Sequence, residues 1–407
     1  MPIETVVTGL GTIGPYGFGR EALAKALAAG KPVASEVDRG GGWHREGGSR
    51  LAALIREPDL SRWIPPAAAR RMSFPSKLAV AAGKMALPDA GIETVASEGG
   101  RAGVYLATAF GPVHNTEKLL RQIFLEGAEA AQPFYFSECV ANTPAAQLAI
   151  AVGARGPNVT IVQREAGPLL AVGRGAQAVR EGRVDRALAG AVEEIPPLLH
   201  ALLGRFGALA QAEEKLAEQP RPLDRRRNGI LAGEGASLLV LEREDAARAR
   251  GARILARVRW SGAAFDATAG VTDWGTGHDA LAAALRAGLA TAGGAAGISM
   301  IVSGASGAKR GDLLEARVLK AVWGEAPLPP VMTPKAVTGE YGGGILAAGL
   351  LALEGKALAP FPEAPELDPE IGFSPHRGAV PEKRARVLLT GLASGGAAAW
   401  LLLERAS

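Results

Sequence analysis

The segment between residues 157 and 194 constrains the fold more than any other part of the chain. Its first residues are rich in β-branched side chains and follow a Gly-Pro pair, which predicts a buried strand. A run of alanine, leucine and glycine over 169–181 predicts a helix packed closely against a sheet, and a second apolar strand is expected at 186–192. The tight turn between the first strand and the helix should place its residue at the end of the sheet, beside helix amide groups. That residue is Glu165.

Strand and helix patterns alternate along the whole chain, which predicts an α/β fold built in layers. The alternation fills residues 1–245 and is repeated over 246–407, so we expect two similar halves, the first of which contains the tight turn. Residues 195–219 are expected to form a helical connection after the 186–192 strand. Residues 65–90 are expected to be mostly helical, with Pro75 and Pro88 as breaks.

Composition excludes several classes of protein. No apolar run reaches the length of about 18 residues that spans a bilayer, and the first residues lack a signal-peptide pattern, so no membrane association is expected. The chain has 1 cysteine, Cys139, which rules out an internal disulfide and favours the cytoplasm. Although the net charge is +4, the basic residues are scattered and lack interleaved aromatic residues, so nucleic-acid binding is not expected.

The densest basic cluster contains Arg221, Arg225, Arg226 and Arg227. It fits either a solvated loop or a docking patch for an acidic partner protein.

A glycine pair at Gly9 and Gly11 resembles part of a dinucleotide-binding loop. The third glycine of that fingerprint is misplaced and no acidic residue follows in register. We therefore expect no nucleotide cofactor. No metal site is expected either.

Four motifs carry a resemblance to a known family. Ala-Gly-Ala-Val-Glu ends at Glu193, Arg-Pro-Leu-Asp begins at Arg221, and further motifs lie at 303–316 and 333–344. Together with the 157–194 segment, they resemble the β-ketoacyl synthases, condensing enzymes of the thiolase superfamily. The resemblance covers about residues 3–405 and implies a thiolase-like fold with a duplicated αβαβα, five-layer architecture. The turn at 164–167 is also similar to that of the chain-length factors, the non-catalytic partners of type II polyketide ketosynthases.

The resemblance implies that the catalytic positions are degenerate. The family's cysteine falls on Glu165 and its two histidines fall on Gly304 and Glu340, while its lysine is retained as Lys335. Decarboxylative condensation needs a thiolate to hold the acyl chain and imidazoles to assist decarboxylation and stabilise negative charge. None of the 5 histidines lies in a matching motif. We therefore expect no condensing catalytic residue, and a subunit that folds like a ketosynthase but does not condense. The family's gating phenylalanine and a nearby asparagine fall on Ser394 and Ala398.

The same resemblance implies a partner. A chain-length factor forms a heterodimer with a cysteine-bearing ketosynthase and works with an acyl carrier protein. The region that lines the tunnel or the interface would here include Phe134, Phe136, Cys139 and Val140, with ordinary core packing as the alternative. Cys139 is expected to act as a small apolar residue, because it precedes the turn and has no histidine near it in sequence.

Two other readings stay open. Glu165 and Glu340 are acid/base candidates in a self-standing enzyme that acts on thioesters, such as a hydrolase or a decarboxylase. The chain is also a candidate for an inactive scaffold homodimer. If the chain is a chain-length factor, we expect Glu165 to have a structural role or a role at the subunit interface, by pairing with Arg164 or with an arginine of the partner. Lys335 and Glu340 are expected to pair with each other.

Overall fold

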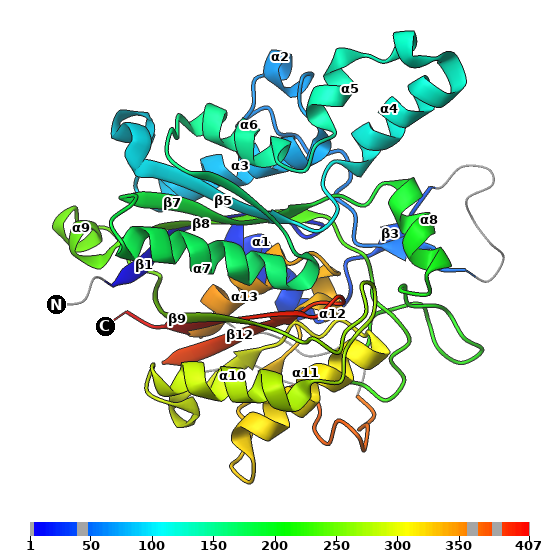
Figure 1. Cartoon of the computed structure of the whole chain (residues 1–407), viewed down its shortest axis with the longest axis vertical. Coiled ribbons are helices and arrows are strands. Elements are labelled where there is room, and N and C mark those ends of the chain that lie inside the picture. The colour runs from blue at the N-terminus through cyan, green and yellow to red at the C-terminus, as the bar shows by residue number, and fades with distance from the viewer. Residues whose placement is uncertain (1–3, 39–47, 356–364, 377–384, 407) are drawn as a thin grey trace.

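The structure is a computed structural model that describes residues 4–38, 48–355, 365–376 and 385–406. The triple glycine at Gly40, Gly41 and Gly42 predicts a surface excursion, but these residues lie outside the described part of the chain. The described chain forms five layers, in which helices alternate with two halves of a mixed sheet (Figure 1). None of the described helices is long and apolar enough to cross a bilayer.

Ten strands form the main path of the sheet. In chain order they are β1 (Thr5–Gly14), β5 (Ala102–Thr108), β6 (Asn158–Val162), β7 (Arg186–Glu193), β8 (Gly235–Arg243), β9 (Ala256–Phe265), β10 (Met300–Val302), β11 (Val331–Met332), β12 (Arg386–Leu392) and β13 (Ala397–Glu404). The short β2 (Gly17–Phe18) pairs with β1, and β3 (Ser35–Glu36) pairs with β4 (Leu51–Ala52) in a separate ribbon.

The two halves of the sheet have the same strand order. From its outer edge inward, the first half runs β6-β5-β7-β8-β1 and the second runs β11-β10-β12-β13-β9. Numbered along the chain within each half, both orders read 3-2-4-5-1. The halves meet where β1 pairs antiparallel with β9 at Val6 and Val7. The expected boundary at residue 245 falls inside the short helix α9 (Glu244–Ala249) that links β8 to β9, and the division itself stays a proposal.

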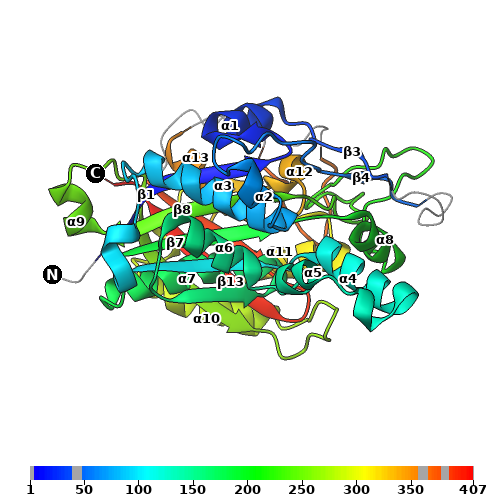
Figure 2. The ribbon, with the colours of Figure 1, turned by 90° about the horizontal axis from the view of Figure 1, so that it is seen from above.

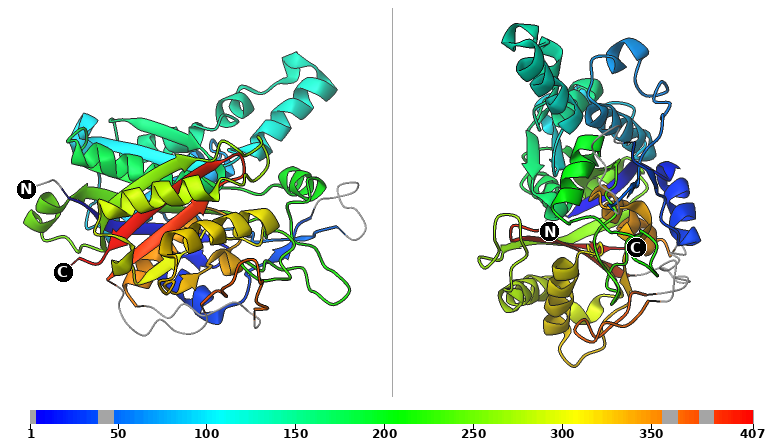
Figure 3. Two further views of the ribbon diagram at one scale, coloured as in Figure 1. Left: turned by 60° about the horizontal axis from the view of Figure 1, so that its bottom comes forward. Right: turned by 90° about the vertical axis from the view of Figure 1, so that its right-hand side faces the viewer.

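Three sets of helices cover the sheets. The first outer layer contains α2 (Pro66–Ala69), α3 (Phe74–Asp89) and α6 (Thr143–Val152), seen from above in Figure 2. The central layer contains α1 (Gly19–Ala29), α7 (Gly167–Arg180), α12 (Lys335–Thr338) and α13 (Gly343–Leu353). The second outer layer contains α10 (His278–Ala290) and α11 (Lys309–Trp323), yellow in Figure 3.

Two further helices, α4 (Val113–Glu126) and α5 (Pro133–Glu138), project beyond the layers, as both views of Figure 3 show.

Alternation along the central strands explains the layering. On β8, Leu239 and Leu241 face the core between the sheets, whereas Leu238 and Val240 face the core under α3 and α6. Such two-sided burial is typical of sheets covered by helices on both faces. Helix α13 is apolar and buried all round, as a helix in the central layer must be.

Three details differ from the sequence-based expectations. Strand β6 is not buried: all five of its residues are exposed or half-buried, because it lies at the edge of the sheet. Within 195–219 only α8 (Pro197–Arg205) is helical. Pro75 does not break a helix but lies in the first turn of α3, where a missing N–H costs nothing, and Pro88 lies near the end of that helix.

Candidate functional site

The turn after β6 carries the position predicted for a nucleophile. A single 3-10 turn, Arg164–Ala166, joins β6 to α7. Arg164 has a φ of 41°, in the left-handed region that non-glycine residues seldom occupy. Its side chain reaches across to the loop between β12 and β13, where Nη1 donates to Ser394 Oγ at 2.6 Å and to the Ser394 carbonyl oxygen at 3.2 Å. The turn is thus attached to the position of the family's gating phenylalanine.

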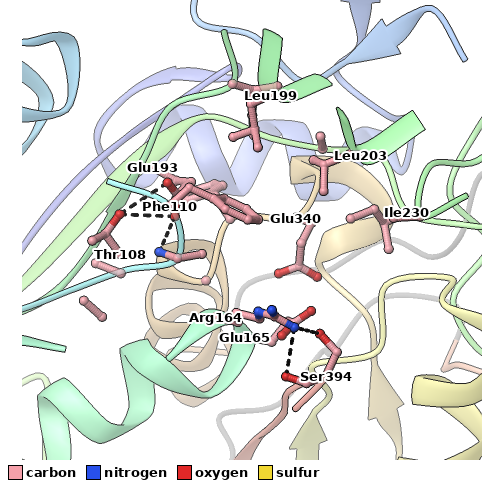
Figure 4. Close-up of a pocket in the computed structure, with 18 of the residues that line it drawn as sticks. Thr108, Phe110, Arg164, Glu165, Glu193, Leu199, Leu203, Ile230, Glu340 and Ser394 are labelled. Carbon is pink, nitrogen blue, oxygen red and sulfur yellow. Dashed lines mark hydrogen bonds between the residues drawn. The ribbon is translucent and has the colours of Figure 1, made fainter. Parts of the chain in front are cut away.

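A cavity of about 440 Å³ lies beside this turn (Figure 4). Its polar end contains Arg164, Glu165, Glu340 and Ser394, and Glu193 lines another part of its wall. Most of its remaining lining is apolar and comes from α8, from the end of β7 and from the loops next to them: Val192, Ile195, Leu199, Leu202, Leu203, Phe206 and Ile230. Size and lining are typical of a site for a small molecule.

Lys335 and Glu340 form an ion pair at the polar end, as expected. Lys335 Nζ lies 2.6 Å from Glu340 Oε1 and donates to Oε2 at 2.8 Å. The lysine side chain is 0% exposed and the glutamate side chain 12%. At the position where the resemblance places the family's second histidine, a carboxylate is therefore bound to Lys335.

Glu165 is not paired with Arg164, one of its two expected partners, because Arg164 donates to Ser394. Pairing with an arginine of a partner subunit stays a prediction. The buried Oε2 atom of Glu165 has no hydrogen-bond partner among the described residues. Burial raises the pKa of Glu165 to about 7, and the charge of Glu340 adds to the rise, while Lys335 and Arg164 oppose it. A carboxyl with such a pKa is poised between its two protonation states at neutral pH.

Close packing leaves no room for a side chain at Gly304, where the resemblance places the family's first histidine. A Cβ atom built on it would lie 2.7 Å from the Thr390 carbonyl oxygen and 3.2 Å from Gly391 Cα. Its N–H donates to Glu315 Oε1 at 3.2 Å, and the Ser303 hydroxyl donates to the same oxygen at 2.6 Å. An imidazole at position 304 would therefore require the backbone of β12 to move.

The four residues predicted for a tunnel or an interface do not reach this cavity. Phe134 and Phe136 lie on α5, and Cys139 and Val140 follow it; none of the four lines the cavity. Phe136 is 67% exposed and Val140 44%, so the alternative of core packing does not hold for these two. The Cys139 thiol is half-buried and donates to the Phe136 carbonyl oxygen.

The predicted arginine patch reduces to Arg225. Arg227 is buried and bonds to Asp368, and Arg226 is held by Asp224 at 2.9 Å. Arg221 is also buried. These side chains are used inside the protein, and only Arg225 is exposed.

Sequence reasoning missed the role of Glu193 as part of the cavity wall. Its carboxylate accepts the Ala109 N–H at 2.6 Å, and burial raises its pKa to about 8. In the sequence, the only sign of this role is that Glu193 stands at the end of an apolar strand. The apolar residues of α8 gave none, because only the fold brings them to the cavity.

Comparisons with known proteins agree with this architecture. The family model described as "Beta-ketoacyl synthase, N-terminal domain" matches residues 4–247. The chain is 30% identical over 342 residues to 3-oxoacyl-[acyl-carrier-protein] synthase 2 of Vibrio cholerae, covering 83% of this chain and 81% of that protein. It is 29% identical over 420 residues to the granaticin polyketide putative β-ketoacyl synthase 1 of Streptomyces violaceoruber, covering 100% and 99%.

Among solved structures, the ishigamide ketosynthase/chain length factor matches with a TM-score of 0.88 and 30% identity, covering 100% of both chains. These similarities confirm the predicted thiolase-like fold and the resemblance to type II polyketide ketosynthases.

Proposed function

The chain belongs to the β-ketoacyl synthase family, and we propose that it is a non-condensing subunit of a type II polyketide ketosynthase, a chain-length factor. In this role it pairs with a cysteine-bearing ketosynthase, limits the depth of the acyl tunnel and works on chains attached to an acyl carrier protein, in the cytoplasm. One relative is described as a 3-oxoacyl-[acyl-carrier-protein] synthase, and one similar structure as a ketosynthase/chain length factor.

The main support for this proposal is the set of residues that stand at the three positions where the resemblance places catalytic groups. Glu165 offers no thiolate, Glu340 is bound to Lys335, and Gly304 has backbone packed where a histidine would begin. A carboxylate cannot hold an acyl chain as a stable thioester, and two carboxyl groups oppose the negative charge that develops during condensation. The scaffold around these positions is otherwise retained, which favours a role that uses the fold without its chemistry.

An exposed apolar surface supports pairing with another subunit. Strand β6 leaves one edge open, with Val159 and Val162 exposed. Exposed apolar side chains also lie on α6, which packs beside β6, and on the projecting helices α4 and α5: Ile150, Leu120, Phe124, Leu125 and Phe136. An open strand edge with exposed apolar residues is a place where proteins pair or aggregate. A partner that extends the sheet from β6 would cover it.

The test is co-expression with a cysteine-bearing ketosynthase from the same organism, followed by native mass measurement and a condensation assay with malonyl carrier protein. We expect a one-to-one heterodimer that extends chains only when both subunits are present. Phe136→Ala should then shift product length, whereas Phe265→Ala, at an exposed site in the second half of the chain, should not. Failure to form a heterodimer, or unchanged elongation by the partner alone, would contradict the proposal.

One observation favours a second candidate. Glu165 has a pKa of about 7, whereas Glu340 is held in an ion pair, so the two carboxyls have the unlike environments of an acid/base pair. A homodimer that turns over a thioester alone, and loses this activity in Glu165→Ala, would identify that enzyme. A homodimer with neither activity would identify a scaffold.

A further inference from the structure

The cavity is a site that the proposed function does not use. A subunit that only shapes its partner's tunnel has no need of a cavity of its own, yet about 440 Å³ remains beside Glu165 and Glu340. Figure 4 shows both side chains at the same end of this cavity, with Arg164 and Ser394 beside them. The cavity therefore combines an apolar wall with a compact polar end.

The polar end has a surplus of acceptors. Arg164 donates to Ser394, and Lys335 is bound to both oxygens of Glu340. Glu193 accepts the Ala109 N–H and the Thr108 hydroxyl. Glu165 Oε2 is buried and accepts no hydrogen bond from the part of the chain that the structure describes. A buried acceptor without a partner is costly, and a donor from a bound molecule would remove that cost.

We propose that the cavity binds an amphiphilic cation, an apolar chain whose ammonium group is held by Glu165 and Glu340. The ammonium supplies several N–H donors and a positive charge to the two carboxyls, and charge-assisted hydrogen bonds of this kind are stronger than neutral ones. The chain lies along the apolar wall made by Leu199, Leu203 and Ile230. A carboxylate or phosphate head group is disfavoured, because both cations at this end already have partners.

Protons are linked to this binding. The charged groups that act on Glu165 are Glu340, Lys335 and Arg164, and Glu193 lines the same cavity. Because the pKa of Glu165 is raised to about 7, the carboxyl is partly protonated at neutral pH. An ammonium requires the ionised form, so its affinity rises as the pH rises through this pKa while the amine itself stays charged.

Calorimetric titration of the full chain with n-octylammonium, n-octanol and octanoate tests the proposal. We expect n-octylammonium to bind roughly tenfold or more tightly than n-octanol, and octanoate to bind most weakly. The affinity for n-octylammonium should rise between about pH 6 and about pH 8.5, with no such change for n-octanol.

Variants locate the site. Glu165→Gln should reduce n-octylammonium to the affinity of n-octanol and remove its pH dependence. The matched control is Glu194→Gln, which changes a buried carboxyl that does not line the cavity. This variant should keep the affinity for n-octylammonium and its pH dependence. Leu203→Trp should weaken all three ligands by filling the cavity.

Octanoate binding as tightly as n-octylammonium, no binding of any probe, or full binding by Glu165→Gln would each overturn the proposal. The ranking of the three probes by the unmodified chain tests it even if a variant does not fold. None of these results depends on the partner subunit, so failure here leaves the proposed chain-length role standing.

Discussion

Replacing Lys335 by methionine tests whether its ion pair with Glu340 stabilises the polar end of the cavity. The lysine side chain is 0% exposed and its partner Glu340 only 12% exposed. Lys335→Met keeps most of the volume but leaves the Glu340 carboxylate without a cation in a poorly solvated place. Breaking a buried pair in this way costs about 3–5 kcal/mol. We therefore expect the free energy of unfolding to fall by that amount.

The assay is urea unfolding followed by tryptophan fluorescence, and the chain offers a matched control. Arg101 and Asp185 form an ion pair at 2.6 Å with side chains 49% and 50% exposed. Arg101→Met should cost much less than Lys335→Met, because water solvates the remaining carboxylate.

The double variant Lys335→Met with Glu340→Gln should recover part of the loss, since it removes both charges. If Lys335→Met costs no more than Arg101→Met, the pair does not stabilise the pocket and the reasoning is wrong.

Other consequences can be measured on the same protein. Gly304→Ala should cost about 1–3 kcal/mol in urea unfolding because its Cβ meets backbone, whereas Gly100→Ala, with open space around the new Cβ, should cost little. Combining Glu165→Cys, Gly304→His and Glu340→His should not restore condensation of malonyl carrier protein, and measurable turnover would contradict the closure at 304. Burial raises the pKa of Glu193 from 4.5 to about 8, so the folded state keeps the proton longer and loses stability as pH rises across that window. Unfolding measured at several pH values should therefore show the free energy of unfolding of Glu193→Gln rising relative to that of the unmodified chain, by up to about 1.4 kcal/mol per pH unit. A constant difference between the two proteins across this pH range would refute the argument.

The motifs predicted more of the fold than of the site. The strand, turn and helix around Glu165, the layered α/β class and the pairing of Lys335 with Glu340 follow from local pattern and resemblance, and the structure has them. β6 was predicted to be buried because its β-branched residues look the same at an edge as at the centre of a sheet. Only the strand order shows that, among the described strands, β6 has β5 on one side and no neighbour on the other.

The sequence by itself determined which residues stand where the resemblance places the family's cysteine and two histidines, namely Glu165, Gly304 and Glu340. The chemistry available at a position depends on the residue found there. Tertiary structure decided the rest. Gly304 is closed by the carbonyl oxygen of Thr390, Arg164 is drawn away from Glu165 by Ser394, and α8 supplies the apolar wall of a cavity. Each of these contacts joins segments far apart along the chain. A local pattern records what a residue can do, whereas only the packed fold fixes which atoms it meets.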